Sequence, residues 1–168
     1  HPSELVAVVG PVGCGKTTLA RALGRMVEVD PGQLWLDGVD ITALDLAELR
    51  GQVGLVPQEG YLFTASLADN LRYGEPDAPF ERVEAAARQA RLEGDIKGFP
   101  DGYQTLVGER GITLSGGQRQ RTALGRALLV RTPLLVLDDA LASVDNTTAA
   151  EILRTIRSEQ ANAQSYEQ

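Results

Sequence analysis

Short apolar runs, each closed by a glycine, proline or aspartate, recur along the chain and indicate strands. The run at 5–9 (LVAVV) predicts a buried parallel strand, and 53–56 (VGLV) and 134–138 (LLVLD) predict further strands of the same kind. Residues 32–38 (GQLWLDG) alternate between apolar and polar positions in the manner of a strand. Together these runs predict the sheet of the protein.

Helical periodicity fills the segments between these runs. After the first run, Leu19, Leu23 and Met26 recur on one face of a predicted helix. Further helical patterns lie at 80–90, 115–129 and 147–156. The order strand, helix, strand, helical block, strand, helix is typical of an α/β fold with a mostly parallel sheet and an inserted helical lobe.

Composition narrows the class of protein. A chain of 168 residues with 43% hydrophobic residues is sufficient for one domain. The sequence has no apolar run long enough to span a membrane and no signal-peptide pattern, so we expect a soluble chain. The single cysteine, Cys14, excludes an internal disulfide and favours the cytosol. A net charge of −7 argues against a nucleic-acid partner.

A phosphate-binding motif follows the first predicted strand. It fits G-x-x-x-x-G-K-[ST] and comprises Gly10, Pro11, Val12, Gly13, Cys14, Gly15, Lys16 and Thr17, with Thr18 next to it. Its glycines let backbone N–H groups converge on phosphate oxygens, and the following helix presents its positive end. In such a motif Lys16 reaches the β- and γ-phosphates, and the Thr17 hydroxyl binds Mg²⁺. The alternative, a glycine-rich turn with a chance lysine, leaves the flanking strand and helix unexplained.

Two carboxylates, Asp138 and Asp139, lie at the end of the last apolar run. Asp138 is placed as a Walker-B aspartate, which holds Mg²⁺ directly or through water. An Asp-Asp pair after a strand is also a common loop start or helix cap, so the pair alone leaves both interpretations open. Combined with the phosphate-binding motif, it favours the metal site.

A second phosphate-binding helix is predicted at residues 114–121 (LSGGQRQR). Ser115 is placed as a helix N-cap, and the residues that open the helix are Gly116, Gly117 and Gln118. One phosphate-binding loop holds one nucleotide, so a second phosphate-gripping helix indicates a site completed by another chain. LSGGQ resembles the signature sequence of ATP-binding cassette (ABC) proteins, which caps ATP bound by the opposite cassette. An ordinary capped, glycine-flexible helix is the alternative.

The resemblance implies a fold, ligands and a partner. The fold is an ABC-type P-loop NTPase, with a RecA-like core at 1–65 and 132–168 and an inserted helical subdomain at 66–131. The ligands are ATP and Mg²⁺, and the partner is a second nucleotide-binding domain. Gln58 resembles the Q-loop glutamine that contacts Mg²⁺, and 142–145 (ASVD) resembles the D-loop that crosses the dimer interface.

Two segments resemble those of exporters. Residues 106–111 (LVGERG) resemble the X-loop, whose acidic residue, Glu109 here, faces the coupling helices of a transmembrane domain. Residues 62–71 (LFTASLADNL) resemble a second exporter segment. We expect 61–63 to form a groove for a partner helix near Gln58, unless its aromatic rings pack within the helical lobe. The expected location is the cytoplasmic face of a membrane.

The catalytic carboxylate departs from the family pattern. Asp139 stands where the family has glutamate as general base, and catalysis is otherwise expected from Gln58 and Lys16. The shorter side chain leaves the carboxylate roughly 1 Å short, and such a misplacement costs about 10²-fold in rate. We therefore expect weakened hydrolysis, as in the degenerate half of a heterodimeric exporter. The alternatives are a regulatory, non-hydrolysing half-site and an importer ATPase subunit.

Three further departures limit the match. The only histidine is His1, so the family's switch histidine is missing, and so is the adenine-stacking aromatic residue upstream of Gly10. These absences indicate an incomplete cassette, either trimmed or lacking unobserved residues, that is weakly active alone. Cys14 replaces the usual serine; its thiol, near a helix N-terminus, is either nucleophilic or a small tolerated substitution.

Overall fold

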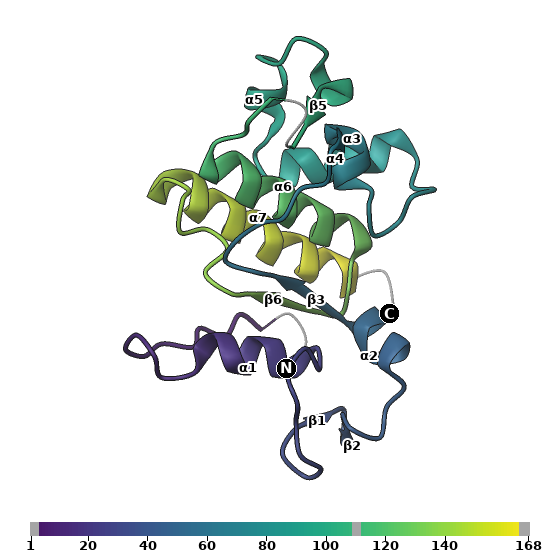
Figure 1. The fold of residues 1–168 in the computed structure, drawn as a ribbon, viewed down its shortest axis with the longest axis vertical. Helices are drawn as coiled ribbons and strands as arrows, with labels where there is room; N and C mark the ends of the chain where they lie inside the picture. Colours follow the sequence, from purple (N-terminus) through teal and green to yellow (C-terminus); the bar gives the residue numbers. More distant parts are fainter. Residues whose placement is uncertain (1–3, 109–111, 165–168) are drawn as a thin grey trace.

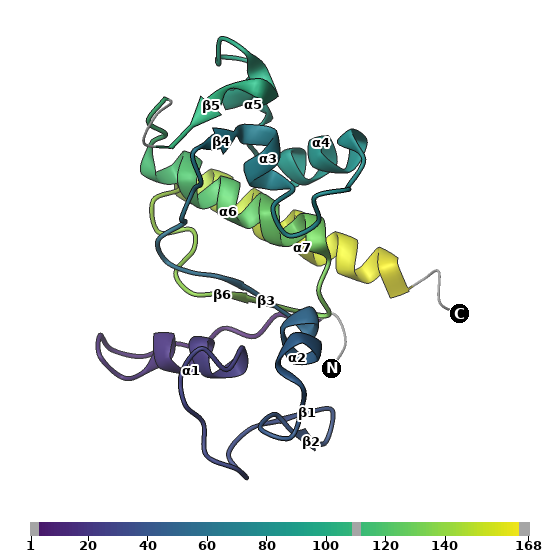
Figure 2. The same ribbon diagram turned by 45° about the vertical axis from the view of Figure 1, so that its right-hand side comes forward.

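Two parallel strands form the centre of the fold in the computed structural model, which describes residues 4–108 and 112–164. They are β3 (Val53–Val56) and β6 (Leu134–Leu137), with Val53 opposite Leu134 and Val56 opposite Leu137. Figures 1 and 2 show this pair between two groups of elements. On one side lie α1 (Lys16–Leu23), β1 (Trp35–Leu36), β2 (Val39–Asp40) and α2 (Leu46–Gln52).

The other side is mostly helical and is built largely from the chain between β3 and β6, because parallel strands require a long crossover connection. Its elements are β4 (Ala65–Ser66), α3 (Leu67–Leu71), α4 (Phe80–Gln89), α5 (Glu93–Ile96), a 3₁₀ turn (Gly102–Gln104), β5 (Leu106–Val107), α6 (Gly116–Val130) and α7 (Asn146–Gln164). The helices predicted at 80–90, 115–129 and 147–156 are confirmed as α4, α6 and α7. No helix of the described residues is long and apolar enough to cross a bilayer.

The β3–β6 pair separates two apolar clusters, because successive side chains of a strand point to opposite faces. Leu134 and Val136 pack against the smaller cluster, which contains Leu49. Leu135 and Leu137 pack against the larger cluster on the helical side. The strand predicted at 134–138 therefore forms, although its side chains are only half-buried.

The apolar run at 5–9 does not form the predicted buried strand. It has no regular secondary structure, and Leu5, Val6 and Val9 are 61%, 70% and 91% exposed. A strand needs a neighbour that offers backbone hydrogen-bond partners. Within the described residues, the only parallel ladder joins β3 to β6. The apolar composition of residues 5–9 predicts burial, but it does not show whether a neighbouring strand is available to pair with them.

The mostly parallel sheet is also smaller than predicted. In residues 4–108 and 112–164 it is a single parallel pair, whereas β1–β2 and β4–β5 are antiparallel two-stranded sheets. The alternating segment 32–38 contributes only β1, because Asp37 and Gly38 have φ of 49° and 81° and turn the chain back into β2. Asp-Gly with two positive φ angles is the pattern of a tight hairpin turn.

The predicted apolar face of α1 is largely open to solvent. Leu19 is 41% exposed and Met26 is 56% exposed, whereas Ala20 is buried. Met26 lies beyond the helix, because Gly24 caps its end and Arg25 has φ of 46°. Of the predicted stripe, only Leu23 packs against the smaller apolar cluster, so the helix is anchored by Leu23 and Ala20.

Candidate functional site

The predicted phosphate-binding loop, residues 10–17, is an open glycine-rich turn that leads into α1. Gly13 and Gly15 have φ of 83° and 96°, a region that glycine adopts without strain. The Lys16 ammonium donates to the carbonyl oxygens of Gly10 and Pro11, at 2.8 and 2.9 Å. Lys16 thus closes the loop into a ring at the N-terminus of an eight-residue helix, where anions are favoured.

The Thr17 hydroxyl and the Asp138 carboxylate meet, although they are 121 residues apart in sequence. Thr17 Oγ1 donates to Asp138 Oδ1 at 2.9 Å. Asp138 is held there because its own N–H continues the β3–β6 ladder to the Val56 carbonyl, at 2.9 Å. Two side chains that the sequence predicts as ligands of one Mg²⁺ are therefore in direct contact.

Hydroxyl and carboxylate oxygens fit Mg²⁺, which takes one or two carboxylates together with nucleotide phosphates. The described residues contain no cluster of three or more His, Cys, Asp or Glu side chains that would hold a metal by themselves. Thr17 and Asp138 are thus suited to a cation that arrives with phosphate oxygens.

Gln58 and Asp139 follow β3 and β6 and lie beside each other. Gln58 Nε2 donates to Asp139 Oδ2 at 3.3 Å, and both residues are exposed. Asp139 has φ of 52°, which aspartate tolerates better than most residues. Of the three predicted catalytic side chains, Gln58 and Asp139 are therefore adjacent and open to solvent, whereas Lys16 contacts the glycine-rich loop.

The helix α6 starts as its sequence predicts. The Ser115 hydroxyl accepts from the Gln118 N–H at 3.2 Å, and the Gln118 carbonyl oxygen Oε1 accepts from the Ser115 N–H at 2.9 Å. This reciprocal capping box satisfies two N–H groups that the helix cannot pair internally. Ser115 is an exposed residue.

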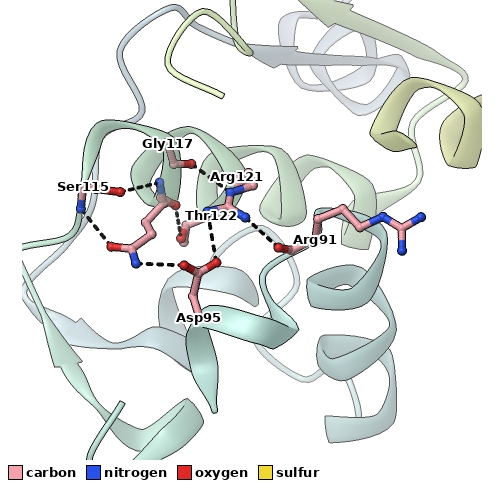
Figure 3. Close-up of polar contacts among 7 residues, drawn as sticks. Arg91, Asp95, Ser115, Gly117, Arg121 and Thr122 are labelled. Atoms are coloured by element: carbon pink, nitrogen blue, oxygen red, sulfur yellow. Dashed lines mark hydrogen bonds and ion pairs between the residues drawn. The ribbon is translucent and has the colours of Figure 1, made fainter. Parts of the chain in front are cut away.

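Asp95 of α5 braces the start of α6 from the side, as Figure 3 shows. Its two oxygens accept from Gln118 Nε2 at 2.9 Å and pair with the Arg121 guanidinium at 3.0 Å. Arg121 also donates to the Arg91 carbonyl at 2.8 Å. No motif marked Asp95, because the contact spans 23 residues and depends on how α5 packs.

The two glycines of the motif pack against the turn that follows Asp139. A side-chain carbon at Gly117 would lie 2.8 Å from the Ser143 carbonyl oxygen, and one at Gly116 would lie 3.2 Å from the Ser143 side chain. Asp145, at the end of this turn, caps α7 by accepting the Thr148 N–H at 2.9 Å. The Thr148 backbone N–H holds the pKa of Asp145 below its usual value, with help from the Thr148 hydroxyl.

The family model that matches this sequence is that of the ABC transporter, and it covers residues 1–142. The chain belongs to the ABC transporter family. The resemblance stated from LSGGQ is thereby confirmed, and the fold is an α/β P-loop NTPase.

The relatives of this ABC chain include exporters. It is 46% identical over 153 residues to the mitochondrial iron-sulfur clusters transporter ATM1 of Gibberella zeae, covering 91% of this chain and 22% of that protein. It is 49% identical over 145 residues to the ATP-dependent lipid A-core flippase of Chromobacterium violaceum, covering 86% of this chain and 20% of the flippase. The chain thus spans about a fifth of the length of these curated relatives.

A solved structure agrees with the sequence relatives of the ABC chain. A bacterial Atm1-family ABC exporter with ATP bound matches it with a TM-score of 0.84 and 40% sequence identity. The match covers 89% of this chain and 26% of the exporter chain.

In the exporter-like segment at residues 61–63, one aromatic ring is packed and the other is exposed. Phe63 stacks on Tyr73 with ring centroids 4.1 Å apart, and Arg126 lies 5.6 Å from the Phe63 ring. Burial lowers the pKa of Arg126, a cost that its hydrogen bond to the Asn70 carbonyl at 2.9 Å offsets. Tyr61 is 69% exposed. Glu109, predicted to face a membrane domain, lies outside the described residues.

Sequence reasoning missed Gln120, which is 5% exposed in the middle of α6. Its side chain bonds to the backbone of Gln58 and of Ser143. The sequence did contain one signal of this role: Gln120 lies four residues before Leu124, which places it on the apolar face of the helix. A polar residue on a buried face has to be hydrogen-bonded.

Proposed function

We propose that this chain is the nucleotide-binding cassette of an ABC exporter, which binds Mg-ATP and pairs head-to-tail with a second cassette. Hydrolysis of ATP in the closed pair would power export. The observation that carries the proposal is the 2.9 Å hydrogen bond between Thr17 and Asp138. Thr17 directly follows Lys16 in the sequence. An ammonium, a hydroxyl and a carboxylate at a helix N-terminus suit a magnesium–triphosphate ligand.

Each side chain has a role in this proposal. Lys16 and the loop amides hold the β- and γ-phosphates. Thr17, Asp138 and the Gln58 amide oxygen would hold Mg²⁺, which would neutralise charge on the phosphate oxygens. Gln58 and Asp139 orient a water molecule toward the γ-phosphate, and Asp139 accepts its proton.

The arrangement of the helices supports a site shared by two chains. Figures 1 and 2 place α1 and α6 on opposite sides of the β3–β6 pair, so the two phosphate-binding helices do not face one another within the chain. Ser115 is exposed at the start of α6, where another molecule's nucleotide can approach it. In this proposal 1–65 and 132–168 form the core and 66–131 forms the helical subdomain.

A membrane domain is the second proposed partner, because the relatives are exporters far longer than this chain. It would dock its coupling helices near Gln58 and Glu109, with the cassette at the cytoplasmic face of the membrane. The exposed ring of Tyr61, three residues after Gln58, supports a contact surface there.

A regulatory half-site is the second candidate function, and Asp139 favours it. The short carboxylate is already hydrogen-bonded to Gln58 at 3.3 Å, and its backbone has φ of 52°. A carboxylate that is one methylene shorter than glutamate and is engaged by Gln58 is a weaker base for a water molecule at the γ-phosphate. In that case the chain binds ATP, turns it over slowly and supplies Ser115 to its partner's site.

Complementation between two inactive copies tests the shared site. Copies of the intact protein carrying Lys16→Ala or Ser115→Arg are co-expressed with different tags, and mixed dimers are purified through both tags. Each single-variant dimer lacks an intact site, whereas the mixed dimer rebuilds one, so we expect about half of the parental turnover per dimer. Mixed dimers without Mg-ATP turnover would contradict a site shared between chains.

A further inference from the structure

We infer that Gln120 is a positioning residue that couples the nucleotide site of this cassette to the turn that faces its partner. The inference rests on the proposed function, because it assigns a role within the same ATP-driven cycle. Gln120 would touch neither nucleotide nor metal. It acts through the backbone groups of Gln58 and Ser143.

Both ends of the Gln120 amide are used. Nε2 donates to the Gln58 carbonyl at 3.0 Å, and Oε1 accepts from the Ser143 N–H at 2.8 Å. A carbonyl only accepts and an N–H only donates, so a single orientation of the amide satisfies both partners. Because the side chain is 5% exposed, water cannot replace either bond without opening the contact.

Close backbone packing leaves little freedom on either side of this bridge. A side-chain carbon at Gly60, beyond Gln58, would lie 2.9 Å from the Arg119 carbonyl oxygen of α6. A carbon at Gly117 would lie 2.8 Å from the Ser143 carbonyl oxygen. The first half of α6 is thus clamped between the two loops. A displacement of one loop has to move α6 or break a buried hydrogen bond.

The two loops have different functional positions. The Gln58 side chain contacts Asp139, so its loop responds to the site that would hold the γ-phosphate. Ser143 belongs to the turn 142–145, which is expected to cross the interface between cassettes. Gln120 therefore joins the sensing loop of one site to the surface that meets the partner. A displacement of the Gln58 loop would be transmitted to the turn 142–145 through the planar amide of Gln120.

The experiment compares Gln120→Met and Gln120→Glu in the intact protein, with Leu129→Val as control. The methionine removes both hydrogen bonds at similar volume. The carboxylate keeps an acceptor for the Ser143 N–H but removes the donor to the Gln58 carbonyl. Leu129 is a buried residue of the same helix, 2% exposed, so its truncation lowers stability without touching either loop.

The readouts are the Kd of Mg-ATP, kcat, KM and hydrogen exchange of residues 140–145 with and without nucleotide. For Gln120→Met we expect Kd and KM within about twofold of the parent, kcat lowered at least about tenfold, and no exchange response in 140–145 to nucleotide. For Leu129→Val we expect kcat within about twofold and a normal exchange response. A Gln120→Met protein with parental kcat, or a Leu129→Val protein with the same loss, would overturn the inference.

Gln120→Glu decides the matter if Gln120→Met does not fold. Its carboxylate keeps an acceptor for the Ser143 N–H but supplies no donor to the Gln58 carbonyl. We therefore expect a kcat lowered at least about tenfold, with the Kd of Mg-ATP within about twofold of the parent. A parental kcat for Gln120→Glu overturns the inference. A parent protein that fails to bind Mg-ATP refutes the proposed function instead.

Discussion

Gly117→Ala is expected to destabilise the protein because the start of α6 packs against backbone. The added carbon would lie 2.8 Å from the Ser143 carbonyl oxygen, closer than such atoms approach without a shift of the chain. Overpacking of this kind costs about 1–3 kcal/mol. Replacing a helical glycine by alanine stabilises by about 1 kcal/mol, so the net change is roughly 0–2 kcal/mol of destabilisation.

Gly51→Ala is the matched control. Gly51 lies in α2, one residue from its end, and a side-chain carbon there would meet nothing within 4 Å. This variant should therefore gain the helix-propensity term, about 1 kcal/mol, without the clash. The difference between the two variants is then the overpacking term alone. At about 2–4 °C per kcal/mol, it separates their melting temperatures by roughly 2–12 °C.

Thermal unfolding followed by far-UV circular dichroism measures both variants under one set of conditions. We expect Gly51→Ala to melt at or slightly above the parent and Gly117→Ala to melt below both. If Gly117→Ala melts at or above Gly51→Ala, then α6 does not rest on the Ser143 turn. The hydrogen bonds that Gln120 makes to Gln58 and Ser143 would then lack the backbone packing that holds the Ser143 turn against α6.

Three further predictions concern single residues. Asp139→Glu in the intact protein should raise the turnover of ATP, by up to about 10²-fold, if the short carboxylate limits hydrolysis; unchanged steady-state kcat would show that it does not. Alkylation of the exposed Cys14 thiol, 3.7 Å from the Lys16 ammonium, should block nucleotide binding, and prior Mg-ATP should slow the labelling measured by mass spectrometry. Equal labelling with and without Mg-ATP would count against that placement. Asp145→Ala should lower the melting temperature at pH 7, because the Thr148 N–H lowers the folded-state pKa of Asp145 and so stabilises the ionised form. That contribution is present above the unfolded pKa, near 3.9, and is lost as pH falls through the lowered folded value, so the two melting curves should converge in acid.

The elements predictable from sequence are those whose signals are local. The start of α6 follows from Ser115 and Gln118, because a capping box lies within one helical turn. The strands at 53–56 and 134–138 combine short apolar runs with breakers at their ends, and both form. The contact between Thr17 and Asp138 was predictable because each residue belongs to a sequence motif that binds Mg²⁺.

Features that depend on tertiary partners were not predictable in this way. The run at 5–9 has the composition of a strand, but its state depends on whether an edge is available, which its own residues do not encode. Asp95 contacts Gln118 of α6 across 23 residues of sequence, and Gln120 of α6 contacts Gln58 across 62 residues, so neither contact has a local pattern. The hydrophobic periodicity of α1 likewise did not reveal that Ala20, rather than Leu19, is the buried residue.

Binding of Mg-ATP to Lys16→Ala, in the intact protein, shows whether the glycine-rich loop holds the triphosphate through its ammonium. Hydrogen bonds to charged groups contribute about 1.5–3 kcal/mol, so loss of the ammonium should weaken binding about 10- to 100-fold. The control is Lys97→Ala, the only other lysine of the chain, which is exposed and pairs with Glu93 at 3.8 Å. We expect isothermal titration to find weakened Mg-ATP binding for Lys16→Ala and parental binding for Lys97→Ala. Parental affinity in Lys16→Ala would show that the Lys16 ammonium does not hold the nucleotide.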